Sequence, residues 1–132
     1  MEQNGLLLAT KTGADITVVR LFALFHDAQR VNETVDHGHG VRSAKLAVSL
    51  RGSLFDISDE AFALLDSACA GHTDGQRTGD PTIGTCWDAD RLDLGRVNII
   101  PDERFMSTAF GKELARAIPG AICLPIASGM HL

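Results

Sequence analysis

The segment from Asp15 to Gln29 constrains the fold more than any other, because its first part is apolar on nearly every side of a helix. The apolar residues fall at positions 16, 18, 19 and 21–25. A helix that is hydrophobic all round is buried within a protein, and Asp15 is expected to cap its N-terminus. We therefore expect a central, buried helix with the other elements packed around it.

Five further segments carry helix signals. Strand signals are weak, because the sequence has no Tyr and no Asn-Gly or Asp-Gly pair lies between two alternating apolar runs. The expected helices run from about Glu2 to Thr10, from about Gly40 to Leu50, from the cap Ser58 to Gly71, from the cap Asp80 (with Pro81 first in the helix) to about Leu94, and from Pro101 to Ala117. The residues from about 118 to 132 are expected to form a loop-like tail. The fold class is therefore all-α, a compact helical bundle.

Length and charge exclude several classes of protein. The chain has 132 residues, which predicts a single domain over 1–132. Its net charge of -5 and the lack of a basic run exclude nucleic acid as a partner. The most apolar window, 16–25, is too short to span a membrane, and the first residues lack the pattern of a signal peptide. The three cysteines are sparse and include no Cys-x-x-Cys pair, which favours a reducing, cytoplasmic location.

Polar residues occupy positions that the helical pattern reserves for the core. His26 continues the apolar line of the central helix and is therefore aimed inward, with Asp27 directly after it. In the helix after Asp80, Asp90 falls on the inward line, whereas Asp88 and Arg91 fall on the opposite face and are expected to pair in solvent. A buried, unpaired carboxylate is costly. A cation over the groove between His26 and Asp27 is the simplest compensation.

The strings LFALFHDAQR and WDADRLDL together resemble the HD-domain superfamily of metal-dependent phosphohydrolases. Members are helical domains named for a His-Asp pair on a central helix, and a second Asp from a later helix completes the metal site. The resemblance assigns these roles to His26, Asp27 and Asp90. The segment DHGHGVRSA is similar to one that carries a further His, here His39, and CAGHTDG is similar to the segment of a later His in two-metal members, here His72.

The resemblance implies a chemistry. A divalent ion (Mn, Fe, Co, Ni, Zn or Mg) would polarise a phosphoryl oxygen and convert a bound water into a hydroxide nucleophile that attacks a phosphomonoester or phosphodiester. Asp27 and His39 would be the catalytic residues, and Arg30, Lys45 and Arg91 would contact phosphate. The substrate would be a small phosphorylated molecule such as a nucleotide, and the apolar tail AICLPIASGM favours a homodimer.

The sequence departs from the family pattern at one point. The first metal ligand of the family is a His on the helix before the central one, and residues 1–25 contain no His. Either the natural chain starts further upstream, so that most of the usual first helix is missing here, or the site is impaired. Two other readings of the family are open: an inactive HD-fold structural or interaction module, and a di-iron oxygenase.

Each candidate residue also has a purely structural interpretation. His26 would hydrogen-bond a backbone carbonyl in the core, Asp90 would form a salt bridge with Arg30 or Arg42, and His39 and His72 would lie near helix ends in contact with water. Cys69 and Cys86 fall on apolar stripes and are expected to be small core residues. A helical bundle unrelated to the family would place His26 and Asp90 far apart.

Overall fold

A computed structural model describes residues 1–26, 38–73, 76–93 and 101–117. These parts of the chain contain helices and no strand; a single bridge joins Arg51 to Phe55. The all-helical fold is thus confirmed. The elements are α1 (Glu2–Thr12), α2 (Ile16–Phe25), α3 (His39–Leu50), α4 (Asp59–Gly71), α5 (Pro81–Leu92), the short 3-10 helix η2 (Glu103–Phe105) and α6 (Ala109–Ala117).

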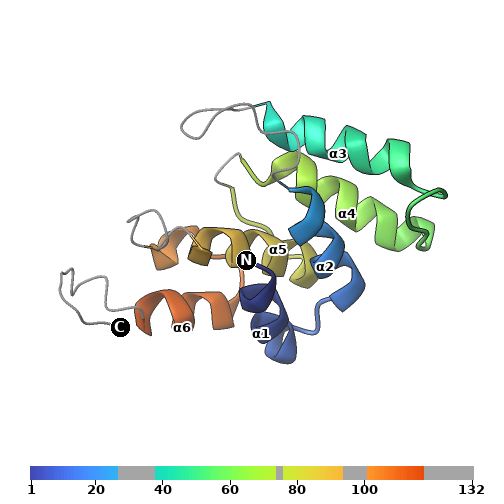
Figure 1. The fold of residues 1–132 in the computed structure, drawn as a ribbon. Coiled ribbons are helices and arrows are strands. Elements are labelled where there is room, and N and C mark those ends of the chain that lie inside the picture. The colour runs from blue at the N-terminus through green and yellow to red at the C-terminus, as the bar shows by residue number, and fades with distance from the viewer. Residues whose placement is uncertain (27–37, 74–75, 94–100, 118–132) are drawn as a thin grey trace.

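The helices pack in two groups that meet at α2 and α5. Helix α3 lies beside α4 (Figure 1), and α1 packs against α5. Helix α2 contacts α1, α3, α4 and α5, whereas α6 and η2 pack beside each other, with α6 against α5 and α1. The C-terminal end of α2 and the middle of α5 are therefore brought close to the α3–α4 pair.

Local capping explains where several helices begin. Asp15, Ser58 and Asp80 each accept hydrogen bonds from backbone N–H groups two or three residues later, which satisfies donors that have no partner within the helix. Pro81 follows the last of these caps at the first helical position. Helix α1 ends at Gly13, whose φ of 76° is left-handed and favours glycine. The caps expected from the sequence are confirmed.

The expected helix from Pro101 to Ala117 is wrong in its first half. The chain forms η2, capped by Asp102, and a separate α6 that begins only after Thr108. The Thr108 hydroxyl accepts a hydrogen bond from the Gly111 N–H at 2.9 Å, as an N-cap does. Between the two, Met106 is 1% exposed and packs into the core. Met106 has extended backbone, with φ −83° and ψ 141°, and the helix is interrupted there.

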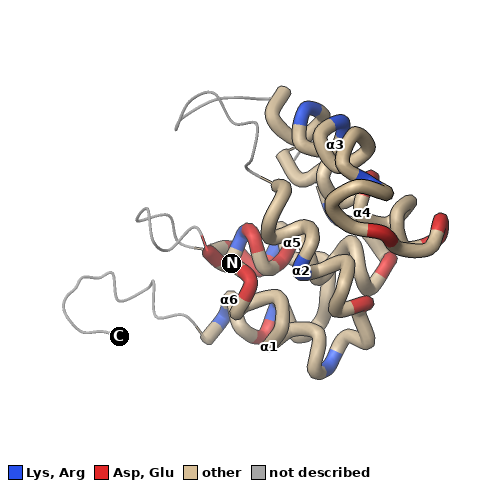
Figure 2. Tube along the Cα trace, turned by 45° about the vertical axis from the view of Figure 1, so that its right-hand side comes forward, with Lys and Arg blue, Asp and Glu red and all other residues tan. Residues whose placement is uncertain are grey.

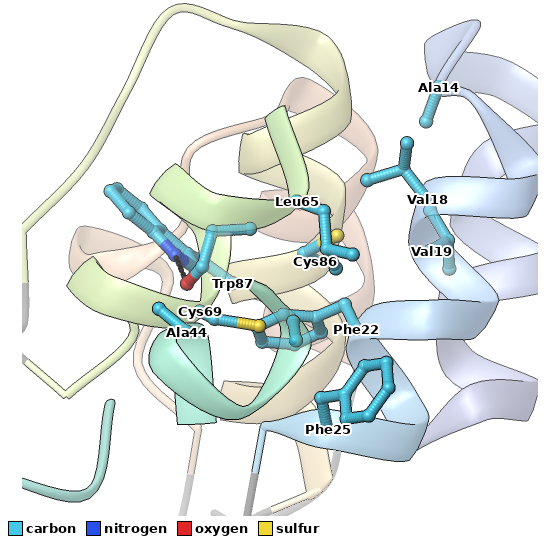
Figure 3. Packing of buried hydrophobic residues seen from close by; sticks show 12 residues of the cluster. Ala14, Val18, Val19, Phe22, Phe25, Ala44, Leu65, Cys69, Cys86 and Trp87 are labelled. Carbon is cyan, nitrogen blue, oxygen red and sulfur yellow. Dashed lines mark hydrogen bonds between the residues drawn. The ribbon is translucent and has the colours of Figure 1, made fainter. Parts of the chain in front are cut away.

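The main core lies between α2, α3, α4 and α5 (Figure 3). Its buried members are Ala14, Val18, Val19, Phe22, Phe25, Ala44, Ala47, Leu65, Ala68, Cys69, Cys86 and Trp87. The expectation that α2 is buried all round is too strong, because Ile16 and Leu24 are 51% and 61% exposed. A smaller cluster of Leu8, Ala89, Leu92, Met106 and Ala115 joins α1 and α5 to α6.

Charged residues are unevenly distributed over the helices. Helix α3 carries Arg42 and Lys45 and no acidic residue, and Figure 2 shows this basic helix at one end of the molecule, with most acidic residues on the other elements. Among the described helices, none has both the length and the apolar character needed to cross a membrane.

Candidate metal centre

His26 lies at the C-terminal end of α2, where its ring is fixed by the helix itself. Its Nδ1 lies 3.1 Å from the carbonyl oxygen of Phe22 and 3.1 Å from that of Ala23. Both carbonyls belong to the last turn of α2, and that of Phe22 also accepts the backbone N–H of His26 at 2.9 Å. Because carbonyls only accept, Nδ1 carries the hydrogen, and the other nitrogen, Nε2, is the atom presented to the rest of the site.

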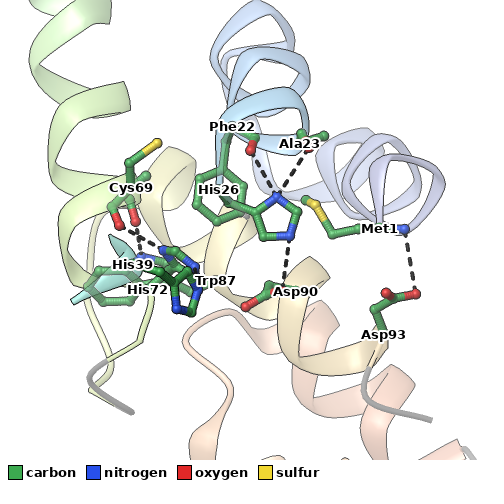
Figure 4. A network of polar contacts seen from close by, with 11 residues as sticks. Met1, Phe22, Ala23, His26, His39, Cys69, His72, Trp87, Asp90 and Asp93 are labelled. Carbon is green, nitrogen blue, oxygen red and sulfur yellow. Dashed lines mark hydrogen bonds and ion pairs between the residues drawn. The ribbon is translucent and has the colours of Figure 1, made fainter. Parts of the chain in front are cut away.

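Asp90 faces this nitrogen from α5. Its Oδ1 lies 3.4 Å from His26 Nε2 (Figure 4), and its side chain is 27% exposed. Asp90, expected to be a buried acid, is only partly buried. The inward direction of the side chain is as expected, because the two residues meet across the contact between α2 and α5.

A second pair joins α3 to α4. His39, the first residue of α3, and His72, directly after α4, are 5% and 6% exposed. Their Nε2 atoms are 2.9 Å apart, and His72 Nδ1 donates to the Cys69 carbonyl at 2.7 Å. As in His26, one ring nitrogen of His72 donates to a backbone carbonyl. The other, Nε2, is directed at His39.

The two pairs form one cluster. The rings of His26 and His72 are 5.5 Å apart between centroids, and Phe22 packs against both, stacked on His26 at 5.1 Å and edge-on to His72 at 5.6 Å. Helices α2, α3, α4 and α5 therefore bring four candidate ligands into one region (Figure 4). Phe22 of α2 packs against two of their rings. Asp27, the fifth candidate ligand, lies outside the described residues.

The donor types and spacings suit a divalent cation. Two ligands of one ion, each about 2.1 Å from it, lie about 3.0 to 3.4 Å apart at octahedral or tetrahedral angles. The separations of 3.4 Å and 2.9 Å within the two pairs are close to this range. Within the ranges that the structure describes, no set of three or more His, Cys, Asp or Glu side chains is arranged to hold one ion. The described donors are thus two pairs, to which Asp27 would add.

The three residues expected to contact phosphate lie in different environments. Arg30 lies outside the described residues, and Lys45 is exposed on the basic helix α3. Arg91, expected on a solvent face, is instead 8% exposed: its Nη1 donates to the Phe105 carbonyl at 2.7 Å, and its guanidinium lies over the Trp87 ring. Burial lowers the pKa of Arg91 from its usual value, against the opposing effect of Asp88 and Asp90. The outward placement of Arg91 was wrong.

Asp88 was also assigned to the wrong environment. It is 0% exposed, and its carboxylate accepts from the Ser107 N–H at 2.6 Å and from the N–H and hydroxyl of Thr108 at 2.8 and 2.7 Å. Burial raises the pKa of Asp88, and these hydrogen bonds and Arg91 oppose the rise. The error arose because α6 covers the face of α5 that helical periodicity alone leaves in solvent.

Cys69 and Cys86 are buried and free, as expected for small core residues. Burial raises the pKa of the Cys69 thiol to about 12 and raises that of Cys86 as well. Both thiols are therefore protonated near neutral pH, which disfavours either one as a nucleophile. Sequence reasoning missed the role of the Cys69 backbone, whose carbonyl orients His72; the only signal was the three-residue spacing of the two at a helix end.

Comparisons of this chain with protein-family models, curated proteins and solved structures found no match. The arguments on function therefore rest on the residues and contacts described above.

Proposed function

We propose that this chain is an HD-type, metal-dependent phosphohydrolase that cleaves a phosphomonoester or phosphodiester bond in a small molecule such as a nucleotide. The observation that carries the proposal is the contact of His26 with Asp90. Nδ1 of His26 is taken up by helix carbonyls, and Nε2 faces a carboxylate oxygen at 3.4 Å. A ring held in this way directs Nε2 at the carboxylate of Asp90.

The His26–Asp90 contact needs a positive charge between its two atoms. A neutral imidazole with hydrogen on Nδ1 has a lone pair at Nε2, and a carboxylate oxygen also has only lone pairs. Two such atoms are held together by a shared proton or a shared cation. Imidazole and carboxylate are ligands that Mn, Fe, Co, Ni and Zn all accept.

The remaining candidates extend this arrangement. His26, Asp27 and Asp90 would hold the first cation, while His39 and His72 would hold a second cation or orient the phosphate. When bound, a divalent cation supplies a Lewis acid that polarises the phosphoryl group and lowers the pKa of water. The exposed Lys45 adds positive charge on α3 for an anionic substrate. The free thiols of Cys69 and Cys86 support the cytoplasm as the location.

The test combines metal content with turnover. The purified chain is loaded with Mn²⁺ or Ni²⁺, desalted and analysed for bound metal, and hydrolysis of p-nitrophenyl phosphate and bis-p-nitrophenyl phosphate is measured. We expect about one or two ions per chain and hydrolysis that depends on them. His26→Ala and Asp90→Asn should lose both. Asp56→Asn is the control, because that carboxylate is 82% exposed and distant from the site in sequence.

A chain that retains no metal and hydrolyses neither compound would overturn the proposal. The His26–Asp90 contact would then be a proton-mediated pair, and the alternative of a non-catalytic helical module would take its place. Equal hydrolysis rates in the wild type, His26→Ala and Asp90→Asn would have the same consequence, because the activity would come from elsewhere.

A further inference from the structure

We propose that Gly40 is a positioning residue that sets the distance between His39 and His72. Its missing side chain lets α3 touch the backbone carbonyl that orients the His72 ring. The value of this spacing for catalysis rests on the function proposed above, whereas the spacing itself is a property of the fold that can be tested alone.

The contact at Gly40 is between backbone atoms. A Cβ at this position would lie 2.8 Å from the Cys69 carbonyl oxygen and 2.9 Å from that of Ala70, nearer than real Cβ atoms come to other atoms. Both carbonyls belong to the last turns of α4. Because backbone at a helix end has no rotamer to change, any side chain at position 40 must push α3 away from α4.

The Cys69 carbonyl oxygen makes two contacts here. It accepts the Nδ1–H of His72 at 2.7 Å, and it forms the surface on which Gly40 rests. His39 is the neighbour of Gly40 at the start of α3, and its Nε2 is 2.9 Å from His72 Nε2. One carbonyl thus fixes the orientation of one ring and the approach of the helix that carries the other.

Ser43 lies beside the same contact. Its hydroxyl is fully buried, donates to the Gly40 carbonyl within α3 at 2.8 Å and interacts with the Cys69 thiol. The hydrogen bond ties residues 40 and 43 of the first turn of α3 together. A displacement caused at position 40 would be transmitted to His39.

The experiment compares Gly40→Ala with the wild type by NMR of ¹⁵N-labelled histidine in the full chain, without metal. The two ring nitrogens of His72 should show the tautomer with hydrogen on Nδ1 in the wild type. In Gly40→Ala we expect these two resonances to move toward the averaged values of an unrestrained ring, with those of His39 changing too. His26, whose Nδ1 faces carbonyls of α2 and whose Nε2 faces Asp90 of α5, reports whether the rest of the site is intact.

Gly84→Ala is the matched control. It adds the same methyl group to another helix at a tight interface, 3.1 Å from Ser107 Cβ and 3.3 Å from Thr108 Cγ2, on the α6 side of α5. It should change stability and leave the His72 resonances as they are. This comparison separates a loss of general packing from a loss of ring orientation.

Two results would overturn the inference. One is a Gly40→Ala chain whose His39 and His72 resonances match those of the wild type. The other is a wild-type His72 with its hydrogen on Nε2, because the ring would then not donate from Nδ1 to the Cys69 carbonyl. This second result needs only the wild type, so it applies even if Gly40→Ala does not fold. Co²⁺ titration adds the link to function: Gly40→Ala should bind about tenfold more weakly or worse. Absence of Co²⁺ binding in the wild type would count against the proposed function and leave the NMR result standing.

Discussion

The carboxylate of Asp88 accepts hydrogen bonds from both the backbone N–H and the hydroxyl of Thr108, so a buried side chain of α5 anchors the start of α6. We expect Asp88→Ala to destabilise the protein by about 3 kcal/mol, because buried donors at residues 107 and 108 lose their acceptor. Urea unfolding followed by circular dichroism measures the change. Asp56→Ala, at a site 82% exposed, should stay within about 0.5 kcal/mol of the wild type. An equal effect of both substitutions would show that Asp88 does not anchor α6.

A metal ion should stabilise the folded chain through His26 and Asp90. At a concentration about one hundred times its dissociation constant, Mn²⁺ or Ni²⁺ should add about 2.7 kcal/mol to the free energy of unfolding. Thermal unfolding with and without the ion, and after addition of a chelator, measures this. Asp90→Asn should show a much smaller shift, whereas Asp56→Asn should behave like the wild type. A shift of equal size in Asp90→Asn would place the bound ion elsewhere.

The buried thiols should make the protein less stable at alkaline pH. Burial raises the pKa of Cys69 to about 12 in the folded state, whereas an exposed thiol ionises near 8.5. The unfolded chain therefore releases this proton first, and stability should fall between these two values by about 1.4 kcal/mol per pH unit for each such thiol. Cys69→Ala should reduce the slope of stability against pH. An unchanged slope would mean that Cys69 ionises in the folded protein.

The same two thiols should be inert to alkylating reagents while the chain is folded. Cys69 and Cys86 are both 0% exposed, and the thiolate is the reactive form. In a Cys123→Ser background, iodoacetamide should modify neither residue until urea unfolds the chain. Mass spectrometry counts the adducts, and rapid modification under native conditions would contradict the burial of these residues.

Trp87 connects the core to the site through a hydrogen bond. Its Nε1 donates to the Ala68 carbonyl of α4 at 2.9 Å, and its ring is 5% exposed. Trp87→Phe should cost about 2 kcal/mol, since it leaves a buried carbonyl without its donor and a small cavity. Circular dichroism in urea measures the loss. Phe105→Leu, at a ring 48% exposed, is the control and should change stability little.

Local sequence signals located most of the helices. Caps such as Asp15, Ser58 and Asp80 act within three residues, so the sequence alone shows where these helices begin. The Ser-Thr pair at 107–108 is a signal of the same kind. Pro101 is also a helix-start signal, and the helix was expected to begin there, which is too early for α6.

The environments of side chains were harder to predict, because they depend on which helices pack together. Periodicity placed Asp90 toward the interior and left Asp88 and Arg91 outside. The start of α6 covers Asp88, and η2 supplies the carbonyl that Arg91 contacts, so both are buried. The meeting of His26 with Asp90 and of His39 with His72 was expected only from the resemblance to a family. Nothing in the spacing of these residues along the chain fixes the distances between them.

Each of the two pairs joins residues that are far apart along the chain: His26 with Asp90, and His39 with His72. Neither contact exists until the intervening chain has folded back on itself, so the cluster is a product of tertiary docking and not of helix formation. In a loosely packed, molten state the helices would persist while the donors drift apart. Such a chain would give a normal far-ultraviolet spectrum and still have lost the constellation on which cation binding depends.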